Sequence, residues 1–226
     1  MLRLENINVA VEGDKQILRD VNLEIPKNSL TVITGQNGSG KTSLAKVLMG
    51  IMQPQQGKIY WDGQDITELA IEKRAALGIG MAFQLPVKFK GFKVREILGI
   101  AAGRRLSGDK LVQVLERVGL PATDYIERNL DGDLSGGEIK RIEIAMLLAR
   151  NSDLMIFDEP EAGIDLWSFE NLMRTFWQLK GEHTIIIVSH QKQILELADN
   201  IVVMKRGRVE AYGKRDEMLE RLCLKK

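Results

Sequence analysis

The chain has 226 residues and carries 32 Lys and Arg against 31 Asp and Glu, so its formal net charge is +1. A charge so close to zero provides no global basic field for nucleic acid or acidic lipid, and we expect no nucleic-acid partner. With 44% hydrophobic and 28% charged residues, the composition is that of a folded globular protein and excludes a disordered chain.

The sequence predicts neither a membrane-spanning segment nor a cysteine-based metal centre. Its longest apolar runs have about five residues, far fewer than the ~18 that span a bilayer. Polar and acidic residues come too early for the apolar centre of a signal peptide, so we expect a cytoplasmic location without membrane insertion. The single cysteine, Cys223, excludes an intramolecular disulfide and a multi-cysteine site built from this chain alone.

Alternating or continuously apolar patterns predict strands at residues 2–9, 17–25, 30–34, 57–61, 78–83, 154–157, 184–188 and 201–204. A helical pattern over residues 41–50 follows the third of these, and further helical patterns separate most of the later ones. Strands that alternate with helices predict an α/β fold with a mainly parallel sheet covered on both faces.

The interval 86–150 differs from the rest of the chain, because it contains no convincing strand pattern. Its helical patterns cover residues 94–102, 109–118 and 136–149. We interpret this interval as a helical insertion.

A phosphate-binding loop is predicted between the strand at 30–34 and the helix at 41–50. Residues 35–42 match the pattern G-x-x-x-x-G-K-[ST], in the strand-to-helix context that this motif requires. A glycine-rich turn with a chance lysine is the alternative, which the flanking strand and helix disfavour. Lys41 would contact the β- and γ-phosphates, and the Thr42 hydroxyl would be a magnesium ligand. The candidate nucleotide-binding residues here are Gly35, Gln36, Asn37, Gly38, Ser39, Gly40, Lys41, Thr42 and Ser43.

Polar residues also follow three other predicted strands. They are Gln84, the pair Asp158 and Glu159, and His190. Because ligands of parallel sheets bind beyond the carboxyl ends of the strands, we expect these side chains to converge on the phosphate loop. Taken singly, each has a plain structural explanation, such as a solvated strand end or a histidine that caps a loop.

The residue types suggest a division of roles at this edge of the sheet. Asp158 ends a Walker B pattern and would hold magnesium opposite Thr42. Glu159 would orient and deprotonate the attacking water as a general base. His190 would hydrogen-bond the γ-phosphate, and Gln84 would ligate magnesium or the water.

A second candidate anion site lies at the start of the predicted helix at 136–149. Ser135 and Glu138 have the spacing of an ordinary capping box, which is the alternative explanation. The capping box leaves Gly136 and Gly137 unexplained, because a capped helix start favours residues that lose less backbone entropy than glycine does. Exposed N–H groups at this helix end would bind a second phosphate group.

With these motifs in this order, the chain resembles the ABC ATPase family over essentially its whole length. The loop at 161–165 after Glu159 belongs to the same set of motifs. The resemblance implies a P-loop, RecA-like sheet with an N-terminal antiparallel β subdomain (residues 1–85 and 151–226) and a helical subdomain (86–150) in a single domain. It also implies Mg²⁺-dependent ATP hydrolysis by two copies arranged head to tail. Ser135, Gly136 and Gly137 of one copy would then face the ATP held by Lys41 of the other.

One departure from the family concerns the adenine base. ABC ATPases often stack adenine on an aromatic residue near the first strands, but this chain has none before Tyr60. We expect Val11 at that position. The preference for ATP over GTP is therefore implied by the family alone.

Within the family, the chain is similar to the SufC group, the ATPases of SUF-type iron-sulfur cluster assembly. The similarity lies in residues 9–15, in residues 82–86 followed by Gly91, and in residues 135–144, whereas Pro160 is more typical of transporter subunits. It implies a SufB-like or SufB/SufD-like scaffold as the partner. The segment after Gln84 tends to contact the partner in ABC ATPases, which implies docking near Phe89 and Phe92, and anchoring of this loop in the core is the alternative. The nucleotide-binding subunit of a membrane transporter is the main alternative. A nucleotide-gated clamp is a second one, which the near-zero charge disfavours.

Overall fold

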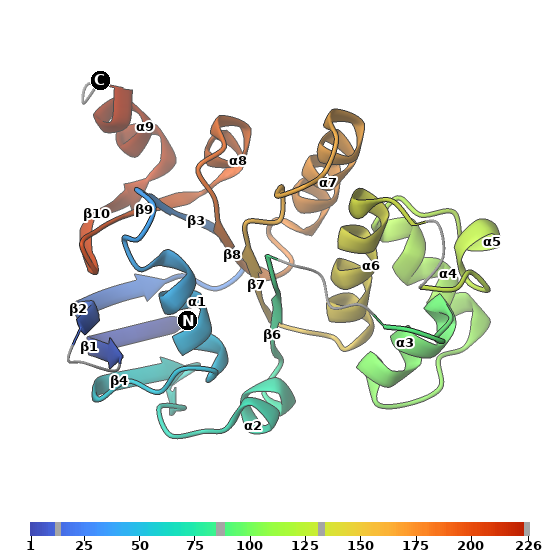
Figure 1. Ribbon diagram of the computed structural model, residues 1–226, viewed down its shortest axis with the longest axis horizontal. Coiled ribbons are helices and arrows are strands. Elements are labelled where there is room, and N and C mark those ends of the chain that lie inside the picture. The colour runs from blue at the N-terminus through green and yellow to red at the C-terminus, as the bar shows by residue number, and fades with distance from the viewer. Residues whose placement is uncertain (12–14, 85–88, 131–133, 224–226) are drawn as a thin grey trace.

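The computed structural model describes residues 1–11, 15–84, 89–130 and 134–223 (Figure 1). A six-stranded sheet forms its centre, with the strand order β10-β9-β3-β8-β7-β6. Neighbouring strands are parallel except for β9 and β10, which confirms the expected mainly parallel sheet. The strands are β3 (Leu30–Gly35), β6 (Ile79–Ala82), β7 (Leu154–Asp158), β8 (Thr184–Val188), β9 (Asn200–Lys205) and β10 (Arg208–Lys214).

The central strands are buried on both faces, because two separate cores cover them. All five residues of β7 and of β8 are buried. Phe157 and Ile187 pack into one core with the helices of the insertion, whereas Ile156 and Ile186 pack into the other with α1 (Lys41–Met49). Burial on both faces explains why these segments are continuously apolar in the sequence.

A second sheet, with the order β2-β1-β4-β5, is antiparallel and confirms the predicted N-terminal β subdomain. Its alternation changes phase within β1, where Asn6 adopts a left-handed conformation with φ of 51° and the pairing register shifts. Leu4 and Ile7, three residues apart, therefore both face the core. The strands are β1 (Leu2–Val11), β2 (Lys15–Ile25), β4 (Gln56–Trp61) and β5 (Gln64–Asp65).

The insertion forms a helical lobe at one end of the molecule, and the antiparallel sheet lies at the other end (Figure 1). The lobe contains α3 (Val94–Ala102), α4 (Gly108–Arg117), α5 (Ala122–Tyr125) and α6 (Gly136–Ala149). The proposed boundary between residues 85 and 86 lies outside the described residues, so the exact division of the chain stays a prediction. The remaining helices are α2 (Ile71–Ala76), α7 (Leu166–Leu179), α8 (Lys192–Leu197) and α9 (Arg215–Cys223).

The sequence patterns did not predict β10 or α8. β10 alternates in burial, but its inner positions are Val209, Ala211 and Gly213, of which only Ala211 is buried, so its apolar signal in the sequence is weak. α8 has six residues, too few to show a helical period. No described helix has both the length and the apolar character needed to cross a bilayer.

A buried arginine fixes the end of the helix that follows the phosphate loop. Arg74 on α2 is fully buried. Burial lowers the pKa of this guanidinium below its ordinary value, and the charge of Glu68 opposes that effect. Its nitrogens donate at 2.6–3.0 Å to the backbone carbonyls of Val47, Leu48, Thr67 and Leu69. One side chain thus satisfies the last carbonyls of α1 and the loop before α2.

Replacing this arginine tests how much the anchor contributes to stability. Arg74→Met should lower the free energy of unfolding by about 3 kcal/mol, because four carbonyls lose their hydrogen bonds from the guanidinium. Urea denaturation followed by circular dichroism measures the change. The exposed neighbour Lys73 provides the control, since Lys73→Met should stay within about 0.5 kcal/mol of the wild type. Equal stabilities of the two variants would contradict the anchoring role.

Candidate active site

The register of the central sheet brings the predicted site residues to one edge. Val188 at the end of β8 pairs with Ile33 on one side and with Asp158 on the other. β6 pairs with β7 up to Ala82 and Phe157. The phosphate loop, Gln84, the Asp158–Glu159 pair and His190 therefore all follow strand ends at the same edge, as the sequence predicted.

The phosphate loop begins at a position where the structure accommodates only glycine. Gly35 has φ of 140°, and a Cβ there would lie 2.1 Å from the carbonyl oxygen of Met204 on β9. The loop then turns back toward α1, and Lys41 Nζ donates to the carbonyls of Gly35 at 2.8 Å and Gln36 at 3.1 Å. The buried lysine is thus held over its own loop at the start of α1.

Two features of this loop fit a bound phosphate. The hydroxyl of Ser39 is buried and has no hydrogen-bond partner among the described residues. Among the described residues, the hydrogen-bond partners of the Lys41 ammonium are two neutral carbonyls, and it lies at a helix N-terminus, where the helix dipole favours an anion. A phosphate group would supply a hydrogen-bond partner for Ser39 and negative charge beside Lys41.

Thr42 and Asp158 form the candidate magnesium site. Thr42 Oγ1 donates to Asp158 Oδ1 at 3.0 Å, which brings the two predicted ligands together. Burial raises the pKa of Asp158 above its ordinary value, and the nearby Glu159 charge adds to this, while the Thr42 hydrogen bond acts in the opposite direction. A divalent cation at these oxygens would offset the cost of the buried negative charge. The donor set therefore fits Mg²⁺.

Glu159 is held in a strained conformation. It has φ of 44°, which is uncommon for a residue other than glycine. Its N–H donates to the Val188 carbonyl at 2.9 Å, and its side-chain Oε2 accepts a hydrogen bond of 2.6 Å from Gln84 Nε2. Gln84 thus contacts the Glu159 carboxylate directly, and its role as a ligand of magnesium or water stays a prediction.

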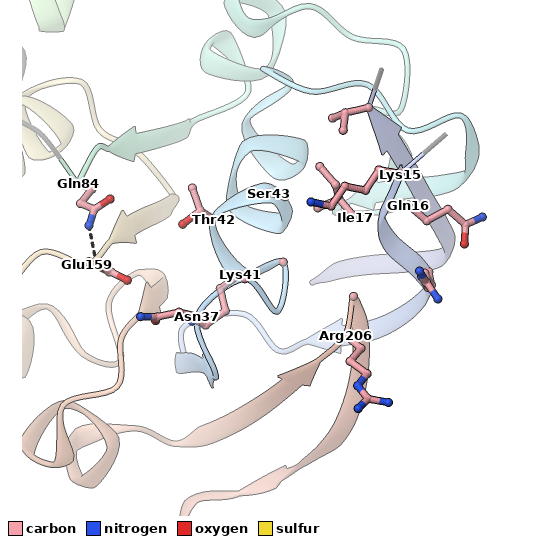
Figure 2. Close-up of a pocket in the computed structure, with 15 residues that line it drawn as sticks. Lys15, Gln16, Ile17, Asn37, Lys41, Thr42, Ser43, Gln84, Glu159 and Arg206 are labelled. Atoms are coloured by element: carbon pink, nitrogen blue, oxygen red, sulfur yellow. Dashed lines mark hydrogen bonds between the residues drawn. The ribbon is translucent and has the colours of Figure 1, made fainter. Parts of the chain in front are cut away.

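Lys41, Thr42, Gln84 and Glu159 line a cavity of about 700 Å³ (Figure 2). Gln84 and Glu159 lie at one end, Lys41 and Thr42 lie in the middle, and Lys15, Gln16 and Ile17 lie at the other end. Val11, for which we expected the position near the base, also lines the cavity, and none of the described lining residues is aromatic.

Sequence reasoning missed the basic residues Lys15, Arg19 and Arg206 in the lining of this cavity. Lys15 and Arg19 are exposed residues of β2 and match no motif. The turn that carries Arg206 could have been found from the sequence, because Arg206-Gly207 is a two-residue hairpin turn between β9 and β10, whereas its place beside the cavity could not. This turn docks on the phosphate loop, since the Gly207 N–H donates to the Ser39 carbonyl at 3.0 Å.

His190 lies at the predicted edge but is exposed and does not contribute to the lining of the cavity. The preceding Ser189 is buried, and its hydroxyl donates to Glu161 Oε1. Burial raises the pKa of Glu161, an effect that the Ser189 hydrogen bond opposes. The loop that carries His190 is thereby tied to the loop after Glu159, while the contact of His190 with a γ-phosphate stays a prediction.

The start of α6 lies outside this cavity. Ser135 and Glu138 form the capping box in both directions, at 3.2 Å and 2.6 Å. Gly137 also has a packing role that the sequence did not reveal, because a Cβ there would lie 2.2 Å from Ser168 on α7. Ser135 and Gly136 remain exposed, so they are accessible to a second molecule.

A model of the ABC transporter family matches residues 18–162. The chain belongs to the ABC ATPase family. It is 35% identical to an uncharacterized ABC transporter ATP-binding protein of Methanocaldococcus jannaschii, over 97% of this chain and 91% of the relative. A probable ATP-dependent transporter of Antithamnion sp., ycf16, is 32% identical over 97% and 94%. The crystal structure of a nucleotide-free ATP-binding cassette from an ABC transporter superposes with a TM-score of 0.87 at 28% identity, covering 99% and 95% of the two chains.

This ABC ATPase hydrolyses ATP and uses Mg²⁺. The positions of its residues fit the predicted roles: Lys41 and the loop N–H groups would bind the phosphates, and Thr42 and Asp158 would hold the metal. Mg²⁺ held by Thr42 and Asp158 would supply positive charge to the phosphates. Glu159 remains the predicted general base, which would accept a proton from the attacking water.

Removing this carboxylate should separate hydrolysis from binding. Glu159→Gln is expected to bind Mg²⁺-ATP with an unchanged Kd, because Lys41, Thr42 and Asp158 remain in place. Its kcat should fall ~10²–10⁴-fold through loss of the base. Phosphate release at saturating ATP gives kcat, and titration with a fluorescent ATP analogue gives Kd. Wild-type turnover of this variant would show that Glu159 is not the base.

Proposed function

We propose that this ABC ATPase converts ATP hydrolysis into movement of a separate partner protein, and that it does so as a head-to-tail pair of copies. The observation that carries the proposal is the separation of two candidate phosphate sites in one chain. Lys41 lines the cavity, whereas Ser135 and Gly136 are exposed outside it. A second copy would bring its own Ser135 to the cavity and complete the site around the γ-phosphate.

A bulky residue at the signature helix tests the paired arrangement. Ser135→Arg should reduce turnover to background, because the side chain would block the approach of α6 to the nucleotide of the other copy. The affinity of one chain for ATP should change less than twofold, since Ser135 does not line its own cavity. Parallel measurements of phosphate release and of fluorescent-ATP binding separate the two effects. Loss of binding would contradict the arrangement in trans.

Two kinds of partner have specific support. The names of the relatives refer to ABC transporters, and this favours a membrane-embedded transporter subunit. The similarity of residues 135–144 to the SufC group favours a SufB-like or SufB/SufD-like scaffold of iron-sulfur cluster assembly. In the second case the cluster would bind to the scaffold, since this chain has one cysteine. We propose a cytoplasmic location in both cases.

A hollow on the helical lobe is the proposed docking surface for either partner. It has a volume of about 730 Å³ and is lined by exposed Phe92 and Ile100, with four basic and two acidic residues around them. This composition suits an acidic amphipathic segment of the partner. Phe89, which we had grouped with Phe92, instead packs against the core. The charged residues are Lys93, Arg95, Arg104, Arg105, Glu96 and Glu127.

Purification of the tagged chain from its native cells, with and without detergent, distinguishes the partners. A multi-helix membrane protein recovered only in detergent supports transport, whereas a detergent-independent partner that carries an iron-sulfur cluster supports the scaffold. Phe92→Ser should lower partner recovery at least fivefold. Ile51→Ser is the matched control, because both side chains are 38% exposed and Ile51 lies outside the hollow. Equal recovery with both variants would contradict docking at this hollow.

A further inference from the structure

The signature helix α6 contains a buried lysine to which no role has yet been given. The side chain of Lys140 is 3% exposed, and its Nζ donates to the backbone carbonyls of Phe83 at 2.5 Å and Gln84 at 3.0 Å. Glu143, one turn further along α6, places Oε2 at 3.4 Å from the same nitrogen. Because a buried ammonium requires acceptors, the two carbonyls beyond α6 strongly restrict where this helix can lie relative to the end of β6.

The two carbonyls belong to the segment that reaches the active site. Gln84 is held at its backbone by Lys140, and its side-chain amide donates to Glu159 Oε2 at 2.6 Å. The hydrolytic carboxylate is therefore connected to α6 through two hydrogen bonds and one residue. Lys140 follows Ser135 by five positions, or about 7.5 Å along a helix. The connection thus begins about one and a half turns from the exposed end of α6.

We propose that Lys140 is a positioning residue for hydrolysis: it fixes the backbone of Gln84, and Gln84 in turn orients Glu159. This inference rests on the proposed function, in which the start of α6 contacts the nucleotide of the second copy. A displacement of α6 moves the ammonium, and the Gln84 segment follows because otherwise two buried hydrogen bonds break. The orientation of Glu159 in one cavity then depends on the engagement of α6 of the same chain with the other cavity.

A purely structural role of Lys140 would give a different experimental result. Lys140 could simply hold the helical lobe against the sheet, and its loss would then weaken folding without acting through Gln84. Arg141 provides the comparison within the same helix. It is also buried and also donates to backbone carbonyls, those of Gly119 at 2.9 Å and Gly137 at 3.3 Å, but it has no contact with Gln84.

A double-mutant cycle with Gln84→Ala separates the two roles. Lys140→Met should lower kcat about tenfold in the wild-type background and less than twofold in the Gln84→Ala background, because the lysine acts only through Gln84. The Kd for Mg²⁺-ATP should change less than twofold. Lys140→Arg should keep kcat within threefold of the wild type, since it retains a charged donor. Arg141→Met should change kcat by the same factor in both backgrounds.

The outcomes distinguish this inference from the proposed function. Phosphate release by purified chains gives kcat, and circular dichroism shows whether each variant is folded. Lys140→Gln replaces Lys140→Met if the latter does not fold, with the same expected pattern. Equal factors for Lys140 in both backgrounds would overturn the positioning role while leaving the ATPase intact. A wild-type chain without turnover would instead contradict the proposed function.

Discussion

The structure depends on the parallel pairing of β8 with β3 on one side and with β7 on the other. This pairing places the ends of three strands level with one another, and each end continues into a segment that the chemistry needs. A one-residue slip of β7 would exchange the faces of its side chains and move Asp158 away from Thr42. Burial of these strands on both faces prevents such a slip, because either face would then present the wrong side chains to its core. Packing far from the nucleotide thus sets the 3.0 Å separation of Thr42 and Asp158.

Buried arginine and lysine side chains also hold segments of the chain in place. Arg74, Lys140 and Arg141 each lie on a helix and donate to backbone carbonyls of another segment. Such contacts are directional, so they fix the position of a loop, and Lys140 also has the Glu143 carboxylate on its own helix. Arg74 ties α2 to α1, and Lys140 ties α6 to the end of β6. The contact of Lys140 reaches Gln84, which lines the cavity.

The sequence was sufficient to predict the parts of the site that follow from strand ends and from the phosphate-loop motif. Gly35, Thr42 and Asp158 lie where a strand, a loop and a helix must place them, and local patterns reveal such places. Arg206 and Gly137 were not predicted in their present roles, because each depends on a contact between segments distant in the chain. The Ser168 side chain that excludes a Cβ at Gly137 is 31 residues away. Patterns of residue type within one segment cannot show which distant segment packs against it.

The geometry of Glu159 explains why hydrolysis would respond to distant segments. Its left-handed backbone conformation costs of order 1 kcal/mol, and such strain persists only where surrounding contacts fix it. Here those contacts are the Val188 carbonyl at the backbone and the Gln84 amide at the carboxylate. A side chain fixed from two directions has little freedom to find a water by itself. Its position is set instead by β8 and by the segment that Lys140 holds. An enzyme that links hydrolysis to movement requires this dependence, because a base that aligned independently would hydrolyse ATP without moving a partner.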